Sequence, residues 1–151
     1  MAMNMSDAPM WDERYSTEEY VFGTDPAAFL TQHEELFVPG SETLVVADGE
    51  GRHSVYLATR GMQVTAMDVS EVGVEKARRL AVDRGATVDF RLADITTWKW
   101  APDAYDMVVA VFIQFLDLEQ RAVAFDGMQR TLRTGGRLLL HGYSVDQLAF
   151  G

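Results

Sequence analysis

Five short apolar runs alternate with helix-like segments along this chain, and that alternation limits its fold more than any other feature. The apolar runs are residues 43–47, 63–67, 87–92, 105–112 and 137–141. Helical patterns are expected over 52–60, from the capping residue Ser70 to Gly85, and over 118–132. This order predicts an α/β fold of the Rossmann-like, doubly wound type, with a mostly parallel sheet and helices on both faces.

The amino-terminal part of the chain predicts one more helix. It is expected to start near Asp25–Pro26, because proline suits the first helical position, and apolar residues follow at helical spacing as far as Phe37. Pro39–Gly40 is expected to end it. Residues 1–10 are expected to be a disordered leader. Residues 11–151 are expected to form one domain, a length that suits a single core.

Charge and composition narrow the range of partners. The chain carries 23 acidic and 13 basic side chains, a formal net charge of −10, and no cysteine. Such a surface repels phosphate backbones and anionic lipids, which argues against nucleic-acid and membrane partners. No apolar run is long enough to span a bilayer, and the first residues lack the pattern of a secretory signal. We therefore expect a cytoplasmic protein with a small-molecule substrate.

Acidic residues follow three successive predicted strands, at the edge where such sheets bind ligands. The turn Asp48–Gly51 follows the first strand, Asp68 ends the second, nineteen positions after Gly49, and Asp94 ends the third. A carboxylate at Asp68 can accept hydrogen bonds from ribose hydroxyls, and one at Asp94 can accept from an adenine amino group, with Ile95 packed on the ring. Each feature alone is also typical of an ordinary turn or capping residue. Their coincidence at three strand ends favours an adenosine-binding site.

The charge of the first turn distinguishes between adenosine ligands. Asp48 and Glu50 would lie beside the pyrophosphate of a dinucleotide, at an electrostatic cost. They suit a ligand that carries an ammonium and a sulfonium group, as S-adenosylmethionine (SAM) does. SAM is therefore favoured over NAD, and a nicotinamide-binding fold remains the weaker alternative.

The motifs of this chain resemble those of the class I SAM-dependent methyltransferases, and among them the small bacterial enzymes of the tellurite-resistance type. From Trp11 onward, the segments that carry the resemblance are WDERYSTEEYVFGTDP, VVADGEGRHSVYLA, VTAMDVS, ADI, YDMVVAVFIQF and LRTGGRLLLHGY. They occur in the order and at the spacing of the family. The chain departs from the family pattern at Val45, where an acidic residue is usual, and at Ala47, where a glycine is usual. Asp48 or Glu50 could supply the missing carboxylate.

The resemblance implies SAM as the cofactor and assigns roles to individual residues. The two loop glycines would pass under its methionine part, Asp68 would hold the ribose and Asp94 the adenine. Ala110–Phe112 would line the methyl-transfer site, while the WDERY stretch would fold over the cofactor, with Arg14 pairing with the cofactor's carboxylate. The cofactor-binding residues expected on this basis are Arg14, Asp48, Gly49, Glu50, Gly51, Asp68, Val69, Asp94, Ile95 and Ala110.

Methyl transfer from a sulfonium is an in-line displacement that needs alignment and exclusion of water, and we expect no metal. His141, at the end of the fifth strand, is a candidate general base, or a strand-end histidine bonded to the backbone. Gln114 follows the fourth strand and is placed to meet the acceptor. Tyr15, Tyr20 and Phe22 could form a lid with cation–π contact to the sulfonium, or could simply pack on the domain.

SAM-dependent methyl transfer to a small-molecule acceptor is the function that these patterns favour. The alternative is a SAM-binding domain without turnover, or a fragment that needs a partner to complete the fold. Family members continue past the fifth strand with a helix and an antiparallel strand pair, which this chain of 151 residues is expected to lack. A homodimer or a swapped segment could then cover the apolar edge of the fifth strand.

Overall fold

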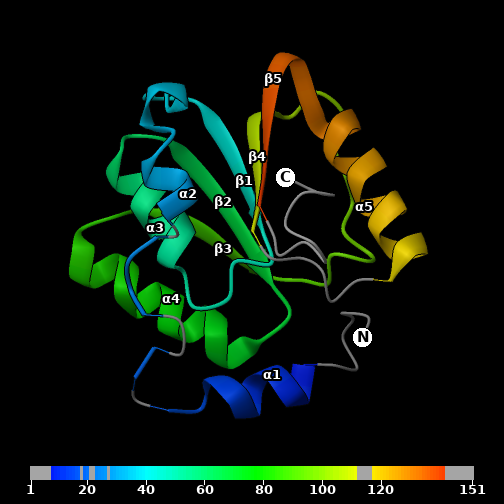
Figure 1. Ribbon diagram of the computed structural model, residues 1–151. Coiled ribbons are helices and arrows are strands. Elements are labelled where there is room, and N and C mark those ends of the chain that lie inside the picture. The colour runs from blue at the N-terminus through cyan, green and yellow to red at the C-terminus, as the bar shows by residue number, and fades with distance from the viewer. Residues whose placement is uncertain (1–7, 18, 21–22, 27, 112–116, 142–151) are drawn as a thin grey trace.

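The computed structural model describes residues 8–17, 19–20, 23–26, 28–111 and 117–141, and within these it contains a five-stranded parallel sheet (Figure 1). The strand order is β3-β2-β1-β4-β5, with every pairing parallel. The strands are β1 (Glu42–Val46), β2 (Gln63–Asp68), β3 (Val88–Leu92), β4 (Tyr105–Val111) and β5 (Leu132–His141). The helices are α1 (Ala8–Tyr15), α2 (Ala28–Thr31), α3 (Arg52–Thr59), α4 (Glu71–Arg84), α5 (Leu118–Thr131) and the short 3₁₀ helix η2 (Glu34–Leu36).

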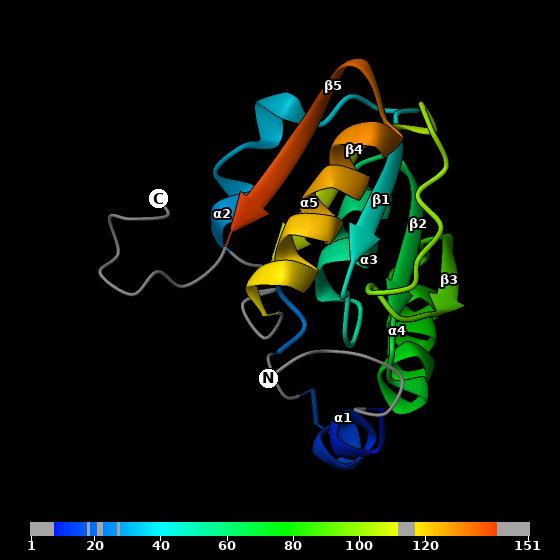
Figure 2. The same cartoon turned by 90° about the vertical axis from the view of Figure 1, so that its right-hand side faces the viewer.

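Alternation of side chains along the strands builds a core on each face of the sheet. Leu44 of β1 points into a cluster that Met128 of α5 completes. Val45, the next residue, points into the opposite cluster, which Leu30 of α2 and Leu57 of α3 complete. Figure 2 shows α5 on one face, with α2, α3 and α4 toward the other. This arrangement confirms the predicted doubly wound architecture.

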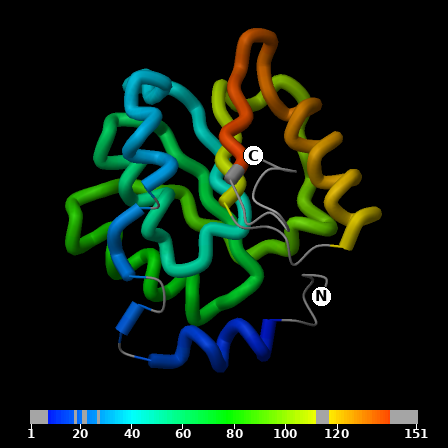
Figure 3. The backbone as a smooth tube through the Cα atoms, viewed as in Figure 1, coloured from blue at the N-terminus to red at the C-terminus, as the bar shows by residue number. Residues whose placement is uncertain are grey.

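The carboxyl ends of the strands share one edge, and α1 lies across that edge beside α4 (Figures 1 and 3). Helix α4 begins and ends as predicted, because the Ser70 hydroxyl accepts a hydrogen bond from the Gly73 amide and Gly85 closes the helix in a left-handed conformation. Asp12 of α1 accepts hydrogen bonds from the Ser70 hydroxyl (2.6 Å) and the Val72 amide (3.1 Å). Helix α1 is therefore attached to the amino end of α4.

Two predictions about the amino-terminal part were wrong. The single helix expected from Asp25–Pro26 to Phe37 is instead the four-residue α2 followed by η2. His33 interrupts it, because its backbone adopts φ −125° and its ring Nδ1 donates to the Phe29 carbonyl oxygen (2.7 Å). In addition, α1 begins at Ala8, so ordered structure starts inside the segment expected to be a disordered leader.

Strand β5 begins five residues earlier than expected, at Leu132, immediately after α5. Its Arg133 forms ion pairs with Asp106 (3.0 Å) and Glu42 (3.4 Å) at the amino edge of the sheet, away from the carboxyl ends. Asp106 also accepts from the Glu42 amide, and these partners lower the pKa of its carboxyl group. Within the described residues, β5 pairs with β4 alone and forms one edge of the sheet.

None of the described helices is both long enough and apolar enough to cross a membrane.

Candidate functional site

Asp68 joins the three loops that follow β1, β2 and β3. Its side chain accepts hydrogen bonds from the Gly49 amide (3.0 Å, Oδ1) and the Ser70 amide (3.0 Å, Oδ2), while its backbone oxygen accepts from the Ala93 amide (2.9 Å). The residue is 4% exposed, and this burial raises the pKa of its carboxyl group to about 6 although the amide donors oppose the rise. The end of β2 is thus the centre of the loop cluster.

The first loop turns through left-handed backbone positions at Ala47 (φ 52°), Gly49 (φ 62°) and Gly51 (φ 92°). Asp48 lies buried beneath it and accepts hydrogen bonds from the Ser54 hydroxyl (2.6 Å) and amide (3.2 Å), which fixes the start of α3. Burial raises the pKa of Asp48 to about 7, against the effect of the Ser54 donors. Sequence reasoning identified this loop but not the support that Ser54 provides.

Gly51 has a packing role in this structure. A Cβ at this position would lie 2.6 Å from the Cβ of Ala77, so the absence of a side chain lets α3 and α4 approach each other. The expectation that Gly51 passes under a cofactor stays a prediction.

The third loop places Asp94 on the same edge as Asp68, because Asp68 pairs with Leu92 in the register of β2 and β3. Asp94 is 3% exposed, and its Oδ1 accepts from both the amide (2.8 Å) and the hydroxyl (2.6 Å) of Thr96. Ile95 beside it is buried in the core cluster. The strand-end carboxylates Asp68 and Asp94 therefore lie on one edge of the sheet, and their contact with a cofactor stays a prediction.

Tyr15 of α1 covers the first loop. A Cβ on Gly49 would lie 2.9 Å from the Tyr15 hydroxyl oxygen, and a Cβ on Gly73 would lie 3.0 Å from its ring. Burial, reinforced by the charge of Asp68, raises the pKa of the phenol above its ordinary value. Gly73, which sequence reasoning missed, carries no signal beyond a glycine in the first turn of a helix.

Glu50 forms a buried ion pair with Lys76 of α4, and each side chain is only 2% exposed. Lys76 was also missed, because a lysine in the charged run EKARR is typical of a solvent-exposed helix face. Glu50 therefore already faces a cation of the protein. Its expected contact with a cofactor is untested.

The other predicted residues lie around this cluster or outside the described chain. Arg14 is exposed, with its guanidinium 5.3 Å from the centre of the Trp11 ring. Val69 and Ala110 are buried, at 1% and 0% exposed, at the ends of β2 and β4. His141 ends β5, but its side chain, Gln114, Phe22 and Phe112 lie outside the described residues. Among the described side chains, no group of three or more histidine and acidic residues could hold a metal ion.

Comparison with known proteins places this chain in a family. Residues 44–136 match a family model described as a methyltransferase domain. The ribosomal protein L11 methyltransferase of Symbiobacterium thermophilum is 30% identical over 149 residues, which cover 89% of this chain and 47% of that protein. In length, the chain spans less than half of each curated relative it matches, from 21% to 47%.

Solved structures share the fold. A TehB-like SAM-dependent methyltransferase from Corynebacterium glutamicum superposes with a TM-score of 0.69 at 19% identity, over 91% of this chain and 73% of that one. A SAM-dependent methyltransferase from Geobacter sulfurreducens, in complex with S-adenosylhomocysteine, gives a TM-score of 0.66 at 19% identity, over 90% of this chain and 53% of that one. The chain belongs to the class I SAM-dependent methyltransferases, within the family whose model describes a methyltransferase domain.

Proposed function

We propose that this chain binds SAM at the carboxyl edge of the sheet and transfers its methyl group to a small-molecule acceptor. The observation that carries the proposal is the charge of the loop cluster. Asp48, Glu50 and Asp68 are all buried there, while Lys76 is the one buried lysine or arginine in the described part of the chain. Buried carboxylates in excess of buried cations favour a cationic ligand. SAM brings an ammonium and a sulfonium to such a site.

The hydrogen-bonding capacity of the cluster fits an adenosine. The Asp68 carboxylate accepts backbone hydrogen bonds from Gly49, Ser70 and Val69, and its two oxygens offer about four acceptor positions, so one is left for a ribose hydroxyl. Thr96 engages only Oδ1 of Asp94 among the described contacts, so Oδ2 can accept from the adenine amino group. Bound SAM would supply a reactive methyl on a positive sulfur, and the protein would align the acceptor and exclude water.

The same charges disfavour a dinucleotide. A pyrophosphate held by the first loop would lie beside the buried Asp48 and Asp68, and like charges at short range in a buried site are costly. The formal net charge of −10 supports a small-molecule acceptor over a nucleic acid. The proposed setting is the cytoplasm, where a chain without cysteine needs no disulfide. His141 and Gln114 remain the candidates for contact with that acceptor.

Calorimetric titration with S-adenosylhomocysteine, with NAD in a parallel titration, tests the cofactor. Turnover with thiol, amine and oxyanion acceptors, followed as release of S-adenosylhomocysteine, tests the reaction. We expect binding of S-adenosylhomocysteine only, and release with one acceptor class. Binding without release in any class would indicate a SAM-binding domain without turnover, and binding of NAD instead would overturn the proposal.

A further inference from the structure

We propose that Lys76 is a positioning residue that holds the amino-terminal segment closed over the first loop and thereby controls how fast the cofactor enters and leaves. This segment, residues 8–17 with 19 and 20, is called the cover below. The kinetic part of this proposal rests on the proposed function, whereas the attachment of the cover by Lys76 does not.

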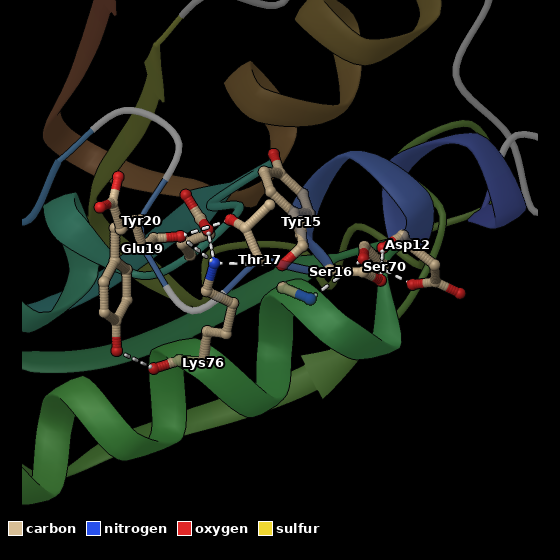
Figure 4. A network of polar contacts seen from close by, with 10 residues as sticks. Asp12, Tyr15, Ser16, Thr17, Glu19, Tyr20, Ser70 and Lys76 are labelled. Atoms are coloured by element: carbon tan, nitrogen blue, oxygen red, sulfur yellow. Dashed lines mark hydrogen bonds and ion pairs between the residues drawn. The ribbon is translucent and has the colours of Figure 1, made fainter.

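The Lys76 ammonium connects the cover to the loop (Figure 4). Its Nζ donates hydrogen bonds to the backbone oxygens of Tyr15 (3.1 Å) and Glu19 (2.6 Å), and it forms the ion pair with Glu50. Tyr20 adds two contacts from the cover: its hydroxyl donates to the Lys76 backbone oxygen (2.9 Å), and its ring centre lies 5.0 Å from Nζ. Three acceptors thus match the three N–H donors of the ammonium.

Because Lys76 is buried, its ammonium group depends on the contacts that the closed cover provides. The Lys76 side chain is 2% exposed, and lysine is almost never fully buried unless it is paired. An ammonium in this place is satisfied only while the Tyr15 and Glu19 carbonyl groups stay in position, because opening the cover removes two of its three acceptors. The pair with Glu50 alone would leave the charge poorly compensated, so Lys76 and Glu50 together favour the closed cover.

The two attachments of the cover to α4 differ in position. Asp12 is bonded at the first turn of α4, to Ser70 and Val72, whereas Lys76 holds the later part of the cover. Tyr15, which stands against Gly49, belongs to the part that Lys76 holds. Loss of the Lys76 contacts would therefore release Tyr15 from the first loop while Asp12 keeps the start of the cover in place.

Holding the cover closed changes the rates of cofactor association and dissociation more than it changes the affinity for the cofactor. A contact that holds the cover closed with or without ligand slows entry and exit by the same factor and leaves the dissociation constant nearly unchanged. A residue that only supports the bound ligand would change the exit rate alone.

The experiment compares Lys76→Met, Glu50→Gln and the double variant with wild type, with Arg78→Met as the control for loss of an exposed cation on the same helix. Amide hydrogen exchange of the free protein reports on the cover. In both Lys76→Met variants we expect exchange in residues 11–20 to rise by about tenfold or more, with residues 107–111 of β4 unchanged. Glu50→Gln keeps both carbonyl contacts, so its cover should stay within about threefold of wild type.

Stopped-flow binding of S-adenosylhomocysteine then measures how fast a ligand enters and leaves past the cover. Association and dissociation rates should both rise by about tenfold in Lys76→Met relative to wild type, while the dissociation constant moves by less than about threefold. The double variant is compared with Glu50→Gln, which carries the same loss of the Glu50 charge, and both rates should again rise by about tenfold. The double variant carries the test even if Lys76→Met alone does not fold, because it leaves no buried unpaired carboxylate.

Unchanged exchange of the cover in the double variant would overturn the proposal, as would an equal rise in β4, which would mark Lys76 as a general support of the fold. A change in dissociation rate without a change in association rate would overturn the kinetic part of the proposal, that Lys76 controls how fast the cofactor enters and leaves. If wild type binds no S-adenosylhomocysteine, the proposed function fails, and the exchange data still decide the attachment.

Discussion

At the scale of single residues, Asp48 and Asp68 are expected to set the pH response of ligand binding. Burial raises their pKa values to about 7 and about 6. A bound ammonium near Asp48 and ribose hydroxyls that donate to Asp68 would each favour the ionised form of the carboxyl group. Affinity for S-adenosylhomocysteine should therefore be constant above about pH 8 and fall as the pH drops below 7, by up to about tenfold per unit for each group. Calorimetry between pH 5 and 8 measures this, and a flat profile would contradict it.

The same two groups give the free energy of unfolding the opposite pH dependence to that of ligand binding. Both folded-state pKa values lie above 3.8, the ordinary pKa of an aspartate side chain, so the folded chain binds extra protons between about pH 4 and 7. Their contribution to the free energy of unfolding is fully present at low pH and is lost as the pH rises through that window. Binding and stability measured on one sample therefore separate the two effects.

Asp68 and Asp94 are expected to hold the adenosine. Asp68→Asn and Asp94→Asn keep the size of each buried side chain but remove its charge and one acceptor. Each should weaken binding of S-adenosylhomocysteine by about 1–3 kcal/mol, as a buried donor loses its partner. Asp126→Asn on α5, where the side chain is 66% exposed, is the control and should leave affinity unchanged. Wild-type affinity in both strand-end variants would contradict the assignment.

Ala47 occupies a backbone conformation that suits glycine. With φ 52° it lies in the left-handed region, where a Cβ costs about 1–2 kcal/mol, and the family pattern has glycine at this place. Glycine loses more entropy on folding, about 0.5–1 kcal/mol, so Ala47→Gly should stabilise the chain by a net of about 0.5–1 kcal/mol. Urea unfolding measures the change, and destabilisation would show that the alanine methyl makes contacts that outweigh the strain.

At the scale of elements, local pattern predicted those parts whose stability is local. The strands follow from their apolar runs, and α4 from Ser70 and Gly85, because a cap and a left-handed stop act within one turn. Helix α1 was not predicted, since it is held by contacts about sixty residues away, from Asp12 to Ser70 and from Tyr15 to Lys76. The site divides in the same way. The strand-end acids are visible in the sequence, and Asp48 is bonded to Ser54 only six residues away, whereas the pairing of Glu50 with Lys76 depends on how α4 packs against the first loop.

Helix α5 offers a test of packing that is separate from the site. A Cβ on Gly127 would overlap the Trp100 ring, which packs against the core cluster on this face. In the interior of an exposed helix, replacing glycine by alanine stabilises the helix by about 1 kcal/mol. At Gly127 the added methyl group would overpack against Trp100, so Gly127→Ala should instead destabilise the chain by about 1–3 kcal/mol. Chemical unfolding measures the sign, and affinity for S-adenosylhomocysteine should not change. A stabilised variant would show that Trp100 can move aside at little cost.

At the scale of the whole molecule, the doubly wound order gathers the binding loops on one edge, while α5 and the Arg133 ion pairs lie elsewhere. The loops after β1, β2 and β3 are joined through Asp68, and the cover is attached to α4, which follows β2 directly. A ligand that bridges these loops therefore binds parts of the chain that come together only in the folded state. Ligand binding should accordingly be measurable as stability of the entire domain.

Thermal unfolding of the full chain makes this quantitative. A ligand at one hundred times its dissociation constant adds about 2.7 kcal/mol to the stability of the folded state, which for a domain of this size raises the Tm by about 5–10 °C. S-adenosylhomocysteine should produce this rise and NAD at the same concentration should not. The rise depends on affinity and not on rates, so Lys76→Met should keep it, whereas Asp68→Asn should reduce it at the same ligand concentration. A rise with NAD alone would mean that the buried carboxylates do not select for a cation, and the charge argument on which the SAM site stands would fail.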